Sequence, residues 1–206
     1  MQPNKRTKNA RAGLMIKIGV IGVQGAVSEH FDMLGRCGVD PILVRTKAHL
    51  KDLDGLIIPG GESTTINRLL VESGMFHTIK KLGENGLPIF GTCAGLILLA
   101  KKGDVQVSKT KQKLLGLMNS EIKRNAFGRQ RESFESNLEI DCIGSYRSVF
   151  IRAQAIEKVW GKCKALAYFN GKIVAARQDN LLATSFHPEL TEDARMHQYF
   201  ISFIKK

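Results

Sequence analysis

The sequence lacks paired cysteines and long apolar runs. Its 206 residues include four cysteines, and no two of them form a CxxC pair. Widely spaced cysteines suit neither a zinc site nor a dense disulfide framework and are typical of a reducing cytosol, so we expect a cytoplasmic protein without a structural metal. The longest apolar stretch, residues 88–100, contains glycine, threonine and cysteine and is shorter than the ~20 residues that cross a bilayer. We therefore expect no membrane association.

Acidic residues are scarce in two segments, which carry much of the net charge of +12. Residues 1–14 hold four basic residues and no acid, and residues 101–131 hold nine basic residues against two acids. A basic surface can face nucleic acid, an acidic partner or solvent. Because no ladder of aromatic residues accompanies the charges, we expect a solvated surface and no nucleic-acid partner. We predict a disordered basic extension at residues 1–14 and a single domain at residues 15–206.

The first half of the sequence alternates short β-branched runs with segments of helical spacing. It predicts strands at residues 16–23, 41–45, 56–58 and 89–90, and helices at residues 26–37, 63–72 and 96–101. The second half changes to strands joined by turns, at residues 122–127, 138–142, 148–152, 165–169, 172–176 and 182–186, before a last helix at residues 193–204. Asn170-Gly171 predicts a tight hairpin. These elements predict a three-layer α/β fold, in which a mainly parallel central sheet has helices on both faces and antiparallel additions.

Cys93 lies in a Gly-x-Cys-x-Gly segment between a predicted strand and a predicted helix. This is the pattern of a nucleophile elbow, with cysteine in the place of serine. The flanking glycines allow a tight turn that exposes one side chain above the sheet edge, where the start of a helix favours a thiolate. The amide of Ala94, the next residue, can donate to an oxyanion. A buried cysteine is usually inert, but this context favours a nucleophile.

His187 and Glu189 follow the predicted strand at residues 182–186. If the extended geometry continues, side chains two residues apart share a face, so that Glu189 can orient the imidazole and stabilise its protonated form. Strand ends at the carboxyl edge of a parallel sheet are where active sites gather. The other four histidines lack an acid at this spacing and are interpreted as structural: His30, His49, His77 and His197.

The Pro-Gly-Gly-Glu-Ser segment at residues 59–63 is a third loop at a strand end. Its two glycines allow a ligand to approach the backbone closely, and free amides at a helix start bind anions. Gly61 is therefore a candidate second oxyanion donor beside Ala94. Ser63 is the predicted cap of the following helix. The segment also fits an ordinary strand-to-helix turn, and it lacks the ending of a P-loop.

Four motifs together resemble the glutaminase subunits of pyridoxal 5′-phosphate synthase, the PdxT/SNO family of triad-type glutamine amidotransferases. They are PGGEST (59–64), GTCAGLILLA (91–100), RNAFGRQ with SFE (124–135) and SFHPELT (185–191). The second and fourth alone indicate only the wider superfamily, whereas the arginine-bearing motif is specific to this branch. The resemblance runs from about residue 16 to residue 204, and the sequence departs from the family pattern only in the basic extension and in the lysine-rich residues 101–113.

The resemblance implies that Cys93, His187 and Glu189 form a catalytic triad that hydrolyses L-glutamine through a thioester. It also implies a set of glutamine-binding residues: Gly61, Glu62, Ser63, Arg124, Ile151 and Arg152. Such a set makes chemical sense because free glutamine carries both a carboxylate and an ammonium group. The implied partner is the synthase subunit, in a hetero-oligomeric complex that uses the ammonia to make pyridoxal 5′-phosphate. No metal or bound cofactor is needed.

Three other functions stay open at this point. One is a glutaminase that serves another synthase, such as that of imidazole glycerol phosphate, which the RNAFGRQ motif disfavours. Another is a peptidase or γ-glutamyl hydrolase on the same scaffold; peptidase-like relatives often place histidine after the nucleophile, where this sequence has Ala94. The third is a non-catalytic nucleic-acid-binding module that uses the basic surface.

Overall fold

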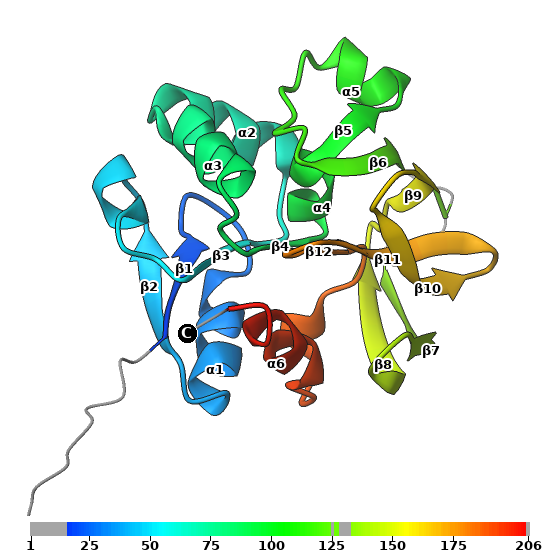
Figure 1. Cartoon of the computed structure of the whole chain (residues 1–206). Coiled ribbons are helices and arrows are strands. Elements are labelled where there is room, and N and C mark those ends of the chain that lie inside the picture. The colour runs from blue at the N-terminus through cyan, green and yellow to red at the C-terminus, as the bar shows by residue number, and fades with distance from the viewer. Residues whose placement is uncertain (1–15, 125, 128–132, 205–206) are drawn as a thin grey trace, which may run out of the picture.

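The computed structural model describes residues 16–124, 126–127 and 133–204 (Figure 1). The predicted basic extension at residues 1–14 lies outside this range, as do Asn125 and residues 128–130 of the arginine-bearing motif. Among the described residues, no helix is both long and apolar enough to cross a membrane.

Five parallel strands form one half of the central sheet. They follow the order β2 (Asp40–Val44), β1 (Lys17–Ile21), β3 (Gly55–Ile58), β4 (Ile89–Thr92) and β12 (Leu181–Thr184). β3, β4 and β12 are buried at every residue, as expected of parallel strands covered on both faces.

Antiparallel pairing dominates the other half of the sheet. It continues through β11 (Lys172–Gln178), β9 (Ala155–Val159), β6 (Met118–Lys123) and β5 (Ala100–Gly103), and β10 (Lys164–Phe169) pairs with β11. Asn170 and Gly171 join β10 to β11 with positive φ angles of 48° and 72°, as the predicted tight hairpin requires. β7 (Ser133–Ile140) and β8 (Gly144–Ile151) form a separate antiparallel pair.

Helices cover both faces of the sheet (Figure 1). α2 (Ser63–Glu72), α3 (Met75–Glu84) and α4 (Ala94–Leu99) contribute to one apolar cluster, and α1 (Val27–Arg36) and α6 (Arg195–Ile201) contribute to the other. The short elements α5 (Val105–Lys109), η1 (Lys47–Leu50) and η2 (Pro188–Leu190) lie in connecting segments. The predicted three-layer α/β fold is confirmed.

Some predicted elements differ from those observed. The helix expected at residues 96–101 ends at Leu99, where the chain enters β5. The strand expected at residues 122–127 is β6, which begins four residues earlier at Met118. α3 and β9 were not predicted, although Gly74 and Gly86 stand on either side of α3.

Candidate active site

Three neighbouring strands bring the predicted site residues to one edge of the sheet. β4 pairs in parallel with β3 on one side, with Ile58 opposite Gly91, and with β12 on the other, with Thr184 opposite Thr92. The carboxyl ends of parallel strands meet at the same edge. The loop at residues 59–63, Cys93 and His187 therefore converge, although almost 130 residues separate the first from the last.

Cys93 occupies a strained turn between β4 and α4. Its φ angle is 48° and its ψ angle −102°, outside the regions that a residue with a side chain favours. The backbone amide of Cys93 donates to the carbonyl of Thr184 at 2.8 Å, which ties the turn to β12. Gly95 packs so closely on the carbonyl of Ile58 that an added Cβ would lie 2.1 Å from its oxygen. The turn therefore has the geometry of the predicted nucleophile elbow.

His187 and Glu189 form a hydrogen-bonded pair at the end of β12. His187 Nδ1 lies 2.7 Å from Glu189 Oε1, and both residues are buried. The pairing does not arise from an extended strand, as predicted from the sequence: β12 ends at Thr184, and Pro188–Leu190 form the 3₁₀ turn η2. Proline fixes the φ angle at the start of this turn, which folds Glu189 back against the imidazole.

The electrostatics of the pair favour a protonated imidazole. Burial lowers the pKa of His187, but the neighbouring Cys93 and Glu189 outweigh burial and raise the pKa to about 10. His187 Nε2 is nevertheless buried and has no hydrogen-bond partner among the described residues. The Cys93 thiol instead lies 3.9 Å from the carbonyl oxygen of Ile151 and 4.0 Å from Gln154 Oε1. The thiol and the imidazole are thus close neighbours without an aligned hydrogen bond, a geometry common before substrate binds.

The glycine loop after β3 packs against the triad. A Cβ added to Gly60 would lie 2.4 Å from His187 Cε1 and 3.2 Å from Cys93 Cβ. Gly61 has a φ angle of 152°, a conformation that side chains disfavour. The Gln24 side chain, which sequence reasoning missed, accepts a hydrogen bond from the amide of Glu62 at 3.1 Å. Gln24 therefore helps to fix the loop whose amides are candidates for the oxyanion hole.

A cavity of about 480 Å³ opens above Cys93. Its lining includes His187, Ala94 and the six residues predicted to bind glutamine: Gly61, Glu62, Ser63, Arg124, Ile151 and Arg152. Gln24, Ile97 and Gln154 also line it and were not predicted. Gln154 is buried, and its side-chain nitrogen has no hydrogen-bond partner among the described residues. Ile97 lies in the GTCAGLILLA motif but was not assigned a role, whereas Gln24 and Gln154 belong to none of the four motifs.

Glu62, not Ser63, caps α2. Its carboxylate accepts hydrogen bonds from the amides of Thr64 and Thr65 at 3.1 and 2.6 Å. Burial raises the pKa of Glu62, but these hydrogen bonds outweigh burial and lower the pKa to about 2. The Ser63 hydroxyl donates to Gln112 Oε1 at 3.1 Å instead, so the predicted cap was wrong. Arg124 Nη2 lies 4.0 Å from Glu62 Oε1, which places two opposite charges at the cavity rim.

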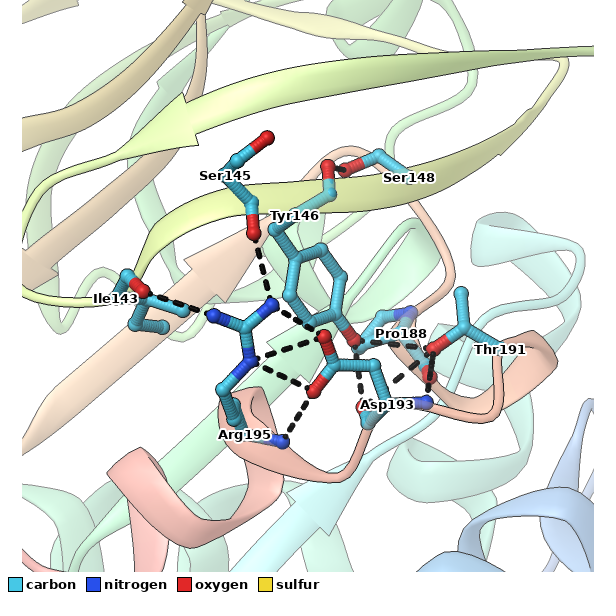
Figure 2. A network of polar contacts seen from close by, with 8 residues as sticks. All are labelled: Ile143, Ser145, Tyr146, Ser148, Pro188, Thr191, Asp193 and Arg195. Carbon is cyan, nitrogen blue, oxygen red and sulfur yellow. Dashed lines mark hydrogen bonds and ion pairs between the residues drawn. The ribbon is translucent and has the colours of Figure 1, made fainter.

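Strand β8 fixes the segment that follows the His-Pro-Glu motif (Figure 2). The Tyr146 hydroxyl donates to the carbonyl of Asp193 at 3.0 Å. The Arg195 guanidinium donates to the carbonyls of Ile143 and Ser145 at 3.0 and 2.7 Å and also pairs with Asp193. Further along β8, the carbonyl of Val149 accepts from the amide of His187 at 2.8 Å. One strand thus supports the backbone on which the paired histidine and glutamate sit.

Two histidines interpreted as structural lie against the triad. His30 Nε2 is 3.5 Å from Glu189 Oε2, and His30 Nδ1 is 3.0 Å from His197 Nε2. No sequence pattern predicts this contact, because α1 and α6 meet only after both pack on the same face of the sheet. Among the described residues, no group of three or more candidate ligands could hold a metal ion.

Solved structures of similar shape identify the class of the protein. A crystal structure of a glutamine amidotransferase matches with a TM-score of 0.85 and 45% sequence identity, over 91% of this chain and 98% of that one. This match, together with a cysteine elbow beside a paired histidine and glutamate, places the chain among the glutamine amidotransferases. The chain belongs to the SNO glutamine amidotransferase family, whose model matches residues 20–206. It is a glutaminase, an enzyme that hydrolyses glutamine and supplies the ammonia for a synthetic reaction.

Curated relatives cover almost the whole chain. The pyridoxal 5′-phosphate synthase subunit PdxT of Methanosarcina barkeri (strain Fusaro / DSM 804) is 50% identical over 93% of this chain and 99% of its own length. The subunit of the same name from Methanococcoides burtonii (strain DSM 6242 / NBRC 107633 / OCM 468 / ACE-M) is 53% identical over 90% of this chain and 98% of its own length. PurLQS from Thermotoga maritima, with 15% identity over 93% of this chain and 100% of that chain and a TM-score of 0.68, shares the fold alone.

Proposed function

We propose that Cys93, His187 and Glu189 hydrolyse L-glutamine to L-glutamate and ammonia. The observation that carries this proposal is the placement of a strained, buried cysteine beside a histidine whose other nitrogen is held 2.7 Å from a buried carboxylate. A cysteine nucleophile needs a neighbouring base, and the base needs a third group to orient it. Glu189 fixes the imidazole so that Nε2 faces the thiol, and it stabilises the imidazolium.

The reaction proceeds through a thioester. The Cys93 thiolate adds to the side-chain amide carbon, and the oxyanion that forms is stabilised by the amides of Gly61 and Ala94. The His187 imidazolium gives its proton to the amide nitrogen, the C–N bond breaks and ammonia leaves. His187 then takes a proton from a water whose oxygen adds to the thioester carbon. The C–S bond breaks, glutamate is released, and the thiolate and imidazolium are restored.

The charges at the cavity rim suit the two ends of free glutamine. Arg124 and Arg152 can bind its α-carboxylate, since a guanidinium matches a carboxylate in charge and shape. Glu62, whose low pKa keeps it ionised, can accept from the α-ammonium group. Gly61, Ser63 and Ile151 complete the walls of the cavity. This recognition explains why a free amino acid, rather than a peptide, is the substrate.

The partner is the synthase subunit of pyridoxal 5′-phosphate synthase, in a cytoplasmic hetero-oligomeric complex. The support is the name that the relatives share, pyridoxal 5′-phosphate synthase subunit PdxT. Free ammonia is protonated in water and lost to synthesis, so its production is useful only next to an acceptor enzyme. The family resemblance implies that the synthase joins this ammonia to a pentose phosphate and a triose phosphate.

One assay tests both the chemistry and the partner. Glutamate release from glutamine is measured for the wild type and for Cys93→Ala, each with and without the synthase subunit. We expect activity only in the wild type, increased by the synthase, because the nucleophile alone accounts for a factor of at least ~10⁴ in such enzymes. Unchanged activity in Cys93→Ala refutes the mechanism, and wild-type activity indifferent to the synthase refutes the partner.

A further inference from the structure

The second oxygen of the triad carboxylate faces a fully buried histidine. Glu189 Oε1 is bound to His187, while Oε2 lies 3.5 Å from Nε2 of His30, which projects from α1. Both side chains are 0% exposed. Glu189 Oε2 has no hydrogen-bond partner among the described residues, and an isolated buried carboxylate oxygen is costly. The proton on His30 therefore decides whether this oxygen faces a donor or a lone pair.

His30 itself contacts two further groups. Its Nε2 lies 3.2 Å from Thr92 Oγ1, on the residue before the nucleophile, and its Nδ1 lies 3.0 Å from Nε2 of His197 on α6. His197 is fully buried, and its Nδ1 has no hydrogen-bond partner in the described part of the chain. Since a neutral imidazole carries one proton, the two rings share a single hydrogen bond that can run in either direction.

One direction satisfies more buried atoms than the other. If His197 donates from Nε2, then His30 accepts at Nδ1 and carries its proton on Nε2, where it faces Thr92 and Glu189. If His30 donates instead, its Nε2 accepts from the Thr92 hydroxyl and offers no proton to Glu189 Oε2, and the proton of His197 moves to Nδ1, where it has no acceptor. A buried unpaired N–H and a buried carboxylate oxygen without a donor are both unfavourable. The first arrangement is therefore the stable one.

We propose that His30 is a positioning residue of the glutaminase reaction, and that it presents an N–H to Glu189 in a tautomer selected by His197. This inference rests on the proposed role of Glu189. The triad thus extends through two more side chains, from Cys93 and His187 to Glu189, His30 and His197. The buried N–H holds the carboxylate in place and favours its ionised form, which the His187 imidazolium requires.

The charge states of the groups around Glu189 agree with this arrangement. Burial raises the pKa of Glu189, but His30 and His187 outweigh it and lower the pKa. Burial lowers the pKa of His30. Burial and the neighbouring His30 lower the pKa of His197 to about 3. Burial thus favours the neutral form of both histidines, in which His30 acts on the carboxylate through its N–H dipole. Two further titratable groups act on this cluster: Tyr146, whose pKa burial raises, interacts with Glu189, and Glu29 interacts with His30.

The experiment compares three variants with the wild type in the complete complex with the synthase. His30→Leu keeps the volume and removes the N–H, whereas His30→Gln returns an N–H near the position of Nε2. Leu34→Val is the matched control, because it trims a fully buried apolar side chain of the same helix. The readouts are kcat and KM for glutamine between pH 5 and 9, and the rate at which iodoacetamide alkylates the Cys93 peptide in the isolated subunit.

We expect His30→Leu to lower kcat about 10- to 100-fold, the effect of losing one hydrogen bond to a charged group, with little change in KM. The acid limb of its kcat profile should move to higher pH, because the carboxylate loses a donor that favours ionisation. The alkylation of Cys93 should slow in the same pH range. His30→Gln should recover most of kcat, and Leu34→Val should match the wild type in all readouts.

Two outcomes overturn the proposal. One is a His30→Leu profile that matches that of Leu34→Val, which reduces His30 to packing. The other is a His30→Gln variant as inactive as His30→Leu. If His30→Leu does not fold, His197→Leu replaces it. This variant should lower kcat about threefold to tenfold, because His30 is then no longer held in one tautomer. An unchanged kcat in His197→Leu also overturns the proposal. Cys93→Ala distinguishes failure of the His30 proposal from failure of the proposed function, since activity in that variant refutes the proposed function itself.

Discussion

At the scale of single residues, Gly60 leaves no room for a side chain beside the triad. An added Cβ would lie 2.4 Å from His187 Cε1 and 3.0 Å from His187 Nδ1, so the imidazole would have to move. Displacing a reacting group by about 1 Å costs about 100-fold in rate. We therefore expect Gly60→Ala to lower kcat for glutamine hydrolysis about 100-fold or more, measured as glutamate release in the presence of the synthase.

Gly35 in α1 provides the matched control for this substitution. No atom lies within 4 Å of a Cβ added there. Because alanine favours the helix more than glycine does, Gly35→Ala should leave kcat unchanged and add about 0.5–1 kcal/mol to the free energy of unfolding. Wild-type kcat in Gly60→Ala would show that the imidazole does not occupy this position during catalysis.

The triad residues and the buried histidines behind them differ in how far the sequence could reveal them. Cys93, His187 and Glu189 sit in short motifs at strand ends, where residue type and spacing carry the chemistry. His30 and His197 are 167 residues apart and belong to no motif. Their contact depends on how α1 and α6 pack, which is a property of the whole tertiary structure. For the same reason Gln154 was not predicted, although it lies beside the nucleophile.

At the scale of elements, the start of α2 depends on the carboxylate of Glu62. We expect Glu62→Gln to lower the free energy of unfolding by about 0.5–1 kcal/mol at pH 7, the usual effect of a helix cap and of a charge at a helix start. The side chain is 47% exposed, so solvent screening keeps the effect small. Urea unfolding at several pH values measures it.

The pH dependence of this effect follows from the lowered pKa of Glu62. The folded value is about 2 and the usual value is 4.5, so the stabilisation is fully present above about pH 4.5 and is lost as the pH falls toward 2. The difference between the wild type and Glu62→Gln should therefore shrink in this range. Glu72→Gln, at the end of the same helix, is the control and should be neutral or slightly stabilising. A pH-independent difference would contradict the role of the charge.

The same helix shows where sequence rules for elements stop. Serine is a preferred cap and glutamate is not, so Ser63 was the reasonable prediction. The cap moved by one residue because the buried Gln112, from a segment 49 residues away, takes the Ser63 hydroxyl. β12 is a second example: the apolar run continues to Phe186, but strand pairing ends at Thr184. Apolar pattern predicts burial, whereas element ends depend on long-range hydrogen bonds.

At the scale of the whole molecule, the alternation of strands and helices was enough to predict the architecture. Short apolar strands alternating with helices have few stable solutions, chiefly a parallel sheet covered on both faces. The order of the strands was not predictable in the same way. β12, from the end of the chain, inserts between β4 and β11, and this long-range pairing brings His187 to Cys93. The site is thus a product of topology as much as of motif.

The continuous sheet predicts that the described part of the chain unfolds as one unit. Cys37 follows α1 near one end of the ten-stranded sheet, and Trp160, the sole tryptophan, follows β9 near the other. Each strand between these two residues pairs with its neighbours. Unfolding of either end of the sheet therefore exposes the apolar clusters that pack against the remaining strands. Pulsed labelling of the half-buried Cys37 thiol and the fluorescence of Trp160 should therefore give the same urea midpoint. Two separate midpoints would instead divide the chain into independently folding parts, and the paired strands β4 and β12 that carry the triad would then mark the boundary to test.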